Sequence, residues 1–245
     1  FVLVRLLPGG PFQDPKVPEA IRAALEARYH LDEPLLAQYG HYMRGLLQGD
    51  LGPSLVAEAR QVSDIVAEAT GASFLIGVPA LVLGTGLGVA LGTVAGLTRR
   101  RWLDDALSLL GLAALSTPSF IFGGLLVLCF ALWWPLFPAA TLASPAHAVL
   151  PVLTLSLVPF AFSFLLVRTS VLETRSSLFV LIKRSFGISE WRVATRHVLR
   201  NSLLPLLSIL GPIAAALVTG SFAVETIYAV PGLGKHFVNA VTNRD

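Results

Sequence analysis

Four long apolar stretches dominate the chain, at residues 69–97, 106–134, 148–167 and 203–224. None contains a charged residue, and each reaches the roughly 20 residues that a helix needs to cross the hydrocarbon core. None shows the strict alternation of a barrel strand. The pattern predicts an all-α, polytopic helical membrane protein with four complete spans in this chain. The prolines in these stretches are expected to kink the helices; they are Pro79, Pro118, Pro151, Pro159, Pro205 and Pro212.

The segments between the stretches alternate in charge, and this alternation orients the spans. Arg99, Arg100 and Arg101 follow the first stretch, residues 135–147 carry no Lys or Arg, and residues 168–202 carry seven of the chain's 18. Because cytoplasmic loops are enriched in Lys and Arg, residues 99–105 and 168–202 are expected on the cytoplasmic side. Residues 8–68 and 135–147, and the segment from Glu225 onward, are then outside.

The two ends of the chain indicate a longer parent protein of about six spans. Residues 1–7 are interpreted as the outer end of a truncated first span, and residues 69–245 as a transmembrane domain with a truncated final span. Residues 8–68, with nine acids and five bases, are expected to form a small external helical segment. One of its helices would run from Pro18 to Tyr29. A second would open at Asp32-Glu33-Pro34 and end at residues 49–52.

Composition supports a membrane protein and excludes several kinds of site. Hydrophobic residues make up 54% of the chain, charged residues 13%, and the mean hydropathy is +0.72, whereas soluble domains carry about 25% charged residues. The net charge of +3 comes from loops beside apolar stretches, so it does not indicate nucleic-acid binding. Cys129 is the single cysteine and has no partner for an internal disulfide. The histidines share no metal-ligand spacing, and we expect no catalytic site, metal or cofactor.

Residues 168–202 form a basic segment that is longer than a connection between two spans requires. Within it, Phe179, Ile182 and Phe186 fall at positions i, i+3 and i+7. This spacing predicts a short helix over residues 178–186 with one apolar stripe. Lys183 and Arg184 lie beside that stripe.

Two further signals divide the basic segment. Gly187 is expected to end the first short helix, and Ser189 is expected to cap a second one over residues 190–199. An amphipathic helix in a cytoplasmic loop lies either on the lipid surface or in the groove of a partner protein. The pattern alone favours the lipid surface slightly.

Glycines recur every fourth residue in the first apolar stretch, at Gly84, Gly88, Gly92 and Gly96. Small residues at this spacing let two membrane helices approach closely. The contact is either inside one subunit or between subunits, and the spacing does not separate these alternatives.

Residues 231–235 (PGLGK) resemble a phosphate-binding loop only in part. Ala229 stands at or near the place of the required first glycine, and His236 follows the lysine in place of Ser or Thr. The segment also lies outside the cell in the orientation above. A turn between two apolar segments is therefore the interpretation.

Two blocks of the sequence resemble one known family. They are residues 187–193 (GISEWRV) with 196–205 (RHVLRNSLLP), and residues 224–228 (VETIY) with 231–234 (PGLG). They closely resemble permease subunits of binding-protein-dependent ABC importers, in the dipeptide/oligopeptide/nickel branch. Supporting likeness comes from residues 6–9, 49–52, 117–120 and 168–173. One stretch departs from the family pattern, because residues 182–186 (IKRSF) stand where the family usually carries an Ala-rich stretch ending in Ala-Lys-Gly.

The resemblance implies a function and a set of partners. The chain would be the membrane subunit of an ATP-driven importer for peptides or similar small solutes, in a bacterial or archaeal plasma membrane or inner membrane. It would pair with a second homologous permease, two cytoplasmic ABC ATPases and an extracytoplasmic solute-binding protein. ATP hydrolysis would take place in the ATPases, so the chain itself is not expected to be an enzyme.

The resemblance also implies roles for particular residues. Coupling to the ATPases through residues 168–202 would involve Phe179, Ile182, Lys183, Arg184, Phe186, Gly187, Glu190 and Trp191. The passage from this loop into the spans would involve Arg168, Glu173, His197, Asn201 and Pro205. An external motif would comprise Glu225, Pro231, Gly232 and Gly234.

Alternative functions remain open at this point. A self-sufficient secondary transporter would work without an ATPase and respond to an ion gradient. A nickel-complex importer would share the family but carry another solute. An intramembrane enzyme would need a polar catalytic pair within the bilayer, and the four stretches contain none.

Overall fold

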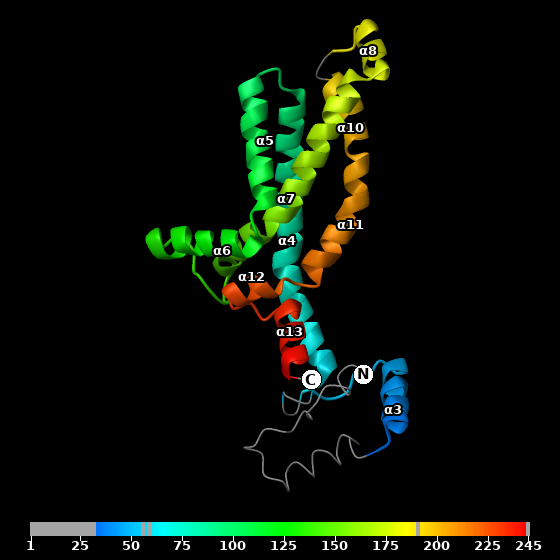
Figure 1. Cartoon of the computed structure of the whole chain (residues 1–245), viewed down its shortest axis with the longest axis vertical. Coiled ribbons are helices and arrows are strands. Elements are labelled where there is room, and N and C mark those ends of the chain that lie inside the picture. The colour runs from blue at the N-terminus through cyan, green and yellow to red at the C-terminus, as the bar shows by residue number, and fades with distance from the viewer. Residues whose placement is uncertain (1–32, 55–56, 58–59, 190–191, 244–245) are drawn as a thin grey trace. The chain divides into compact units, whose positions relative to one another are not determined.

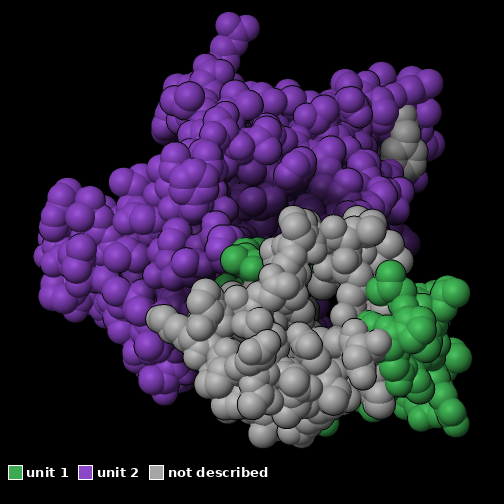
Figure 2. Space-filling view, turned by 60° about the horizontal axis from the view of Figure 1, so that its bottom comes forward, with its two compact units in different colours: residues 1–69, 236–245 green, residues 70–235 purple. Residues whose placement is uncertain are grey.

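The computed structural model describes residues 33–54, 57, 60–189 and 192–243, and its elements are helices (Figure 1). Two compact units are present, residues 1–69 with 236–245 and residues 70–235 (Figure 2). The expected first external helix, from Pro18 to Tyr29, and the expected span end at residues 1–7 lie outside the described residues.

The second expected external helix is present in the first unit. Helix α3 (Leu35–Leu47) begins directly after Pro34. Gly49 and Gly52 follow it with φ of 78° and 81°, in the left-handed region that glycine adopts without strain. The side chain of Asp50 accepts a hydrogen bond from the backbone N–H of Gly52 at 2.8 Å, which closes the turn. The sequence signals for both ends of this helix are therefore confirmed.

Within the described residues, three helical segments are long and apolar enough to cross a membrane, which confirms the polytopic all-α class. They are α4 (Val62–Leu97), α7 (Pro145–Ser176) and the segment Leu199–Ile227. Both α4 and α7 are longer than their apolar stretches. In particular, α7 continues for nine residues beyond Val167, so the start of the basic segment is helix and not loop.

The second apolar stretch is not one straight helix, and this corrects the expected span over residues 106–134. It forms α5 (Arg101–Ser116), α6 (Ser119–Val127) and the π-helical turn η1 (Leu128–Trp133), with a bend of 103° between α5 and α6. Pro118 causes the break. Its ring disfavours helical backbone in the preceding residue, and Thr117 has φ −90° and ψ 118°. The pair is either a broken span or a re-entrant loop, and if it is one span, the described residues hold four.

The fourth stretch is also interrupted, which corrects the expected helix over residues 203–224. It forms α10 (Leu199–Ser202), α11 (Leu204–Val218) and α12 (Phe222–Ile227). The break lies at Gly220, whose φ of +87° a residue with a side chain rarely adopts. Pro205 is in the first turn of α11, where the missing N–H costs no hydrogen bond.

The helices of the second unit place the two kinds of loop at opposite ends (Figure 1). The α4–α5 connection, with Arg99 and Arg100, lies at the same end as α8 (Leu178–Ser185). Helices α6 and α12 lie across the other end and contact each other. Both basic segments therefore share one side of the unit, as the charge pattern predicted. Helix α13 (Leu233–Asn243) begins within this unit and continues into the other.

Two buried clusters form the apolar core of residues 70–235. The cluster near α6 and α12 comprises Ile76, Ala80, Leu126, Leu150, Leu155, Leu217, Val224, Tyr228 and Val230. The cluster at the basic end comprises Val167, Val171, Val180, Val193, Val198 and Leu206. The second cluster joins α7, α8 and the segments up to α11, so the basic segment is part of the packed structure.

The glycine seam of α4, made of Gly84, Gly88, Gly92 and Gly96, lies against α7 of the same chain. A Cβ built on Gly88 would lie 2.7 Å from the carbonyl oxygen of Phe160 and 2.6 Å from the Cβ of Ser163. A Cβ on Gly92 would lie 2.7 Å from the carbonyl oxygen of Phe164. These are distances to backbone atoms or short side chains, which cannot move aside cheaply. The seam is therefore an internal contact, one of the two alternatives that the spacing left open.

A matched pair of substitutions in α4 tests this seam. Gly88→Ala should lower stability by about 1–3 kcal/mol, because the methyl group overpacks the contact with α7. Gly86→Ala is the control, since no atom lies within 4 Å of a Cβ built there. It should leave stability unchanged or raise it, because Ala is the better helix former. The measurement is thermal unfolding of the detergent-purified protein, and equal melting temperatures for the two variants would contradict the assignment.

Candidate functional site

Helix α8 confirms the expected short helix to within one residue and is anchored from within. Val180 is fully buried and packs with Val167 and Val171 of α7, and with Val193 and Val198 farther along the chain. One face of α8 is therefore fixed to the ends of the spanning helices. A connecting loop without such contacts would move independently of them.

Gly187 ends α8, as expected, with a φ of +71°. The backbone N–H of Ile188 donates to the carbonyl oxygen of Lys183 at 3.4 Å, and that of Phe186 donates to Ile182 at 3.2 Å. The first of these bonds is the 6→1 bond of a Schellman motif, in which a left-handed glycine closes the helix.

The second short helix differs from the expected one over residues 190–199. Residues 190 and 191 are outside the described residues, so the start at Glu190 and the position of Trp191 are not described. From Val193 to Val198 the chain forms the π-helical turn η2, and α10 continues it to Ser202. The Ser189 carbonyl accepts a hydrogen bond from Val193 N–H at 3.0 Å.

The face of α8 that points away from the buried valines is apolar and exposed. Leu178 is 70% exposed, Leu181 60%, Ile182 45% and Phe186, just after the helix, 75%. The first three share one side of the helix, because positions three and four apart are neighbours. The exposed stripe thus contains Leu178 and Leu181 in addition to Ile182 and Phe186 of the predicted stripe. Four large apolar side chains are thus exposed at this end of the unit, beyond the apolar stretches.

The exposure of the other sequence-predicted residues of this loop varies. Glu173 and Asn201 are exposed, and Pro205 is exposed at the start of α11. Lys183, on α8, is half-buried. The side chains of Phe179, Arg184 and His197 lie outside what the structure describes.

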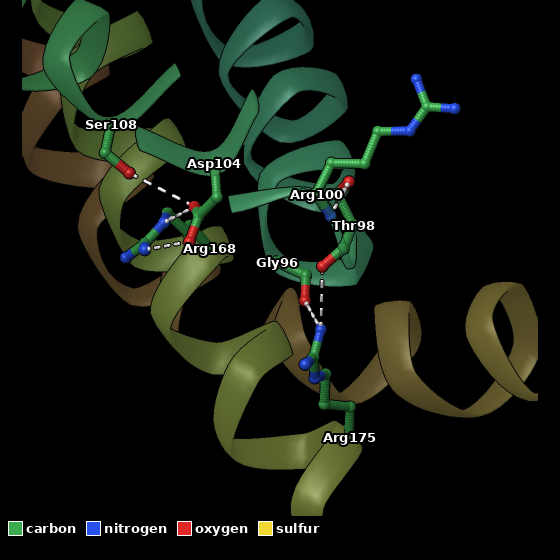
Figure 3. A network of polar contacts seen from close by, with 7 residues as sticks. All are labelled: Gly96, Thr98, Arg100, Asp104, Ser108, Arg168 and Arg175. Carbon is green, nitrogen blue, oxygen red and sulfur yellow. Dashed lines mark hydrogen bonds and ion pairs between the residues drawn. The ribbon is translucent and has the colours of Figure 1, made fainter. Parts of the chain in front are cut away.

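Directly beneath the loop, two arginines of α7 tie three helices together (Figure 3). Arg168 donates from Nε to Oδ1 of Asp104 at 2.6 Å and from Nη2 to Oδ2 at 2.8 Å. Such a paired, charge-assisted contact is geometrically specific, and it fixes α5 to α7. Ser108 donates to the same carboxylate at 3.3 Å. The sequence pointed to Arg168 but not to its partner.

Arg175 makes the second contact, which sequence reasoning missed. Its Nη1 donates to the carbonyl oxygen of Gly96 at 2.7 Å and to that of Thr98 at 3.4 Å (Figure 3). These carbonyls are at the C-terminal end of α4, where helices leave acceptors without partners. A cation is also favoured there by the helix dipole.

At the opposite end of the unit, Glu225 is the centre of the expected external motif. Its side chain is fully buried, whereas the charge pattern had placed it at the start of an outer loop. Ser73 Oγ donates to Oε1 at 3.0 Å, and the backbone N–H of Lys235 donates to Oε2 at 2.7 Å. Ser73 Oγ in turn accepts from the N–H of Leu233 at 2.9 Å. A buried carboxylate is expensive unless it is hydrogen-bonded, and here both of its oxygens are.

The glycines of the external motif make room for this carboxylate. A Cβ on Gly232 would meet the Glu225 carboxyl group and, at 2.7 Å, Ser73 Oγ, while a Cβ on Gly234 would lie 2.7 Å from the backbone N of Phe222. Pro231 is exposed at the turn. The backbone N–H groups at the start of α13, which have no partner within the helix, therefore face the carboxylate of Glu225 from the same chain. This geometry agrees with the turn that was preferred over a nucleotide-binding loop.

Tyr228, close to this motif in the sequence, makes a further buried polar contact. Its hydroxyl donates to the carbonyl oxygen of Gly123 at 3.1 Å and lies 2.8 Å from Thr154 Oγ1. A Cβ on Gly123 would lie 3.1 Å from Thr154 Cγ2, so this glycine also serves a close contact. Tyr228 thereby joins α12 to α6 and α7.

A half-open cavity of about 420 Å³ lies along α7 and α11. It is lined mainly by apolar residues together with two serines: Ser119, Leu155, Val158, Pro212, Ile213, Ala216, Leu217, Gly220 and Ser221. Within the described residues, no group of three or more His, Cys, Asp or Glu is placed to hold a metal ion.

Comparison with known proteins identifies the family. Residues 88–245 match the family described as "Binding-protein-dependent transport system inner membrane component". The chain is similar to the dipeptide transport system permease protein DppB of Bacillus subtilis, with 39% identity over 246 residues that cover the whole chain and 80% of that protein.

Two further relatives have a comparable extent of similarity. The oligopeptide transport system permease protein OppB of Escherichia coli K12 is 36% identical over 248 residues, covering the whole chain and 81% of that protein. DppB of Lactococcus lactis is 34% identical over 245 residues, with the same coverage. The resemblance drawn from the two sequence blocks is confirmed. The protein is a multi-pass protein of the inner membrane, and it belongs to the family of binding-protein-dependent transport system inner membrane components.

Proposed function

We propose that this chain is one of two permease subunits of an ATP-driven peptide importer, and that residues 168–202 couple it to cytoplasmic ATPases. The observation that carries the coupling proposal is the exposed apolar stripe of Leu178, Leu181, Ile182 and Phe186 on an anchored helix. The relatives are permeases of dipeptide and oligopeptide transport systems, which supports peptides as the solute.

The surroundings of the stripe support a protein partner over the lipid surface. Arg192, Arg196 and Arg200 are exposed on the same loop, so the loop presents positive charge as well as the apolar stripe. A groove with an apolar floor and an acidic rim is complementary to such a surface. The stripe also follows the Arg168–Asp104 pair along the chain. It comes after the end of α7, which continues nine residues past its apolar stretch.

The anchoring of α8 supports its role in transmitting movement. Its buried Val180 packs on α7 and is in one cluster with Leu206 of α11. A displacement of α8 by closing ATPases would therefore displace the ends of two spanning helices. We propose that this movement switches the translocation path between inward-facing and outward-facing states, a two-state change biased by ATP. The cavity along α7 and α11 would contribute to the wall of that path.

The outer end completes the proposal. The segment around Glu225, Gly232 and Gly234 is on the side opposite to α8, where an extracytoplasmic binding protein would deliver the solute. The chain would supply half of the path, a second permease the other half, and the ATPases the hydrolysis.

The coupling proposal is tested by placing a charge on the stripe. Phe186→Asp should abolish copurification of the ATPases in detergent or reduce solute-stimulated ATP hydrolysis at least tenfold. The reason is that a buried, unpaired carboxylate in an interface costs several kcal/mol. The measurement is pull-down and ATPase activity of the complete complex. A stripe that only rests on lipid would leave the detergent-stable complex intact, and that result would sink the proposal.

Ser189→Asp provides the matched control for this experiment. It adds the same charge at an exposed position of the same loop, where an acid before a helix is favourable. Its ATPase copurification and stimulated hydrolysis should remain within about twofold of the wild type.

The turn at Gly187 gives a second prediction. Gly187→Ala should weaken coupling because a left-handed conformation costs a residue with a side chain about 1–2 kcal/mol. Gly187→Asn should be milder, since Asn tolerates this conformation better. Stimulated ATP hydrolysis should rank wild type, Asn, then Ala. An Ala variant as active as the wild type would show that the turn geometry is not required.

Energy source and solute are tested together by uptake into proteoliposomes that contain the complete complex. Uptake of labelled di- and oligopeptides should require internal ATP and persist when the proton and sodium gradients are collapsed. Uptake driven by an ion gradient without ATP would identify a secondary transporter. Competition by a nickel complex, but not by peptides, would reassign the solute.

A further inference from the structure

Helix α4 connects the two ends of the second unit without interruption. Ser73 and Gly96 are 23 residues apart on this helix, which corresponds to about 35 Å at 1.5 Å per residue. That distance is close to the thickness of the hydrocarbon core, about 30 Å. The helix therefore carries one polar contact near each surface of the membrane.

The outer network consists of Ser73, Glu225 and the backbone N–H groups of Leu233 and Lys235. It fixes α12 and the start of α13 to α4 through three hydrogen bonds of 2.7–3.0 Å. Gly220 and Gly232 pack directly on the carboxyl group of Glu225. The carboxylate therefore cannot leave Ser73 unless the turn around it opens.

The inner contact consists of Arg175 and the carbonyl groups of Gly96 and Thr98. Arg175 is in the last turn of α7, three residues before α8 begins. It thus joins the cytoplasmic end of α4 to the base of the helix that is proposed to meet the ATPases. The position of α8 depends on this end of α7, because α8 contacts α7 and Val180 belongs to the same buried cluster as Val171.

Between the two contacts, the glycine seam holds α4 against α7 at backbone distance. A Cβ on Gly88 or Gly92 would be within 2.7 Å of a carbonyl oxygen of α7. Close-packed backbones move together, since sliding would bring atoms into overlap. The helix is therefore fixed to its neighbours at both ends and along its length.

From these contacts we propose that Ser73, Glu225 and Arg175 are positioning residues for transport. They make α4 a rigid connection, so that a movement of the outer segment is transmitted to α8 and a movement of α8 to the outer segment. The inference rests on the proposed function, because it assigns the outer end to a solute-binding protein and the inner end to the ATPases. Docking at the outer segment would shift α4 through Ser73, and Arg175 would pass that shift to the base of α8.

The test is a double-mutant cycle on the complete complex reconstituted with its binding protein. Ser73→Ala removes the hydroxyl that serves Glu225 and Leu233, and Arg175→Met keeps the length of the side chain but removes its donors. Each single variant should lower the stimulation of ATP hydrolysis by the loaded binding protein about fivefold or more, while basal hydrolysis stays unchanged. The double variant should be no worse than the more affected single variant, because both break one connection.

Three comparisons make the experiment decisive. Thr93→Ala should leave stimulation unchanged, since that hydroxyl is on the same helix but bonds only to the carbonyl oxygen of Val89. Ser73→Thr and Arg175→Lys retain donors and should restore most of the stimulation. Losses that multiply in the double variant, unchanged single variants, or conservative variants as defective as the others would each overturn the inference.

The result can be separated from failure of the proposed function. If the wild-type chain copurifies with no ATPase, the proposed function itself is wrong, and the inference that rests on it falls with it. If the complex assembles and hydrolyses ATP, the cycle tests the connection alone. Should Ser73→Ala fail to assemble, Glu225→Gln replaces it, because its amide keeps the size of the side chain but loses one of two acceptors. The same non-additivity with Arg175→Met is then expected, and additivity again overturns the proposal.

Discussion

The close approach of α4 and α7 is the constraint on which the rest of this structure depends. In a bilayer, helices gain little by hiding apolar side chains from one another, because the lipid is equally apolar. Association must come from dense contact, and density at backbone distance is available only where side chains are absent. The glycine seam supplies that surface on α4. Pro159 and Phe164 of α7 fill the opposite side, and Phe164 also lies against Gly111 of α5. Helix α7 is thus approached closely by two helices, α4 and α5, and each presents glycines to it.

The charged groups described above lie where this packing ends. Asp104, Arg168 and Arg175 are grouped at the basic end, and Glu225 and Ser73 at the other. In each group a charge is satisfied by a partner that comes from a different helix. Such contacts add direction to a packing interaction that has little of its own, because a misplaced helix would leave a buried charge unpaired. Packing brings the helices together, and the polar groups determine how far each helix is shifted along its axis relative to its neighbour.

Much of the fold was accessible from the sequence because its signals are local. Apolar stretches, loop charges, the spacing of Ile182 and Phe186, and Gly187 each act within a few residues. Breaks inside spans were harder to predict. Pro118 was expected to kink a helix but ends it, since Thr117 adopts extended backbone. At the site around Glu225, the sequence indicated Glu225 but not its partner Ser73, which is 152 residues away in the chain. An ordinary serine in an apolar stretch gives no sign of its partner. Asp104 and Arg175 were missed for the same reason.

The composition of the cluster beneath α8 determines how stiff that joint is. Five of its six buried members are valines, and a valine has one rotatable side-chain bond with one strongly preferred setting in a helix. Leucine or methionine at these positions could absorb a push by changing rotamers. Valines cannot, so the joint has low compliance. If α8 couples to ATPases as proposed, a force on its exposed side would reach the membrane helices mainly as displacement, with less of it absorbed by side-chain rearrangement in this cluster.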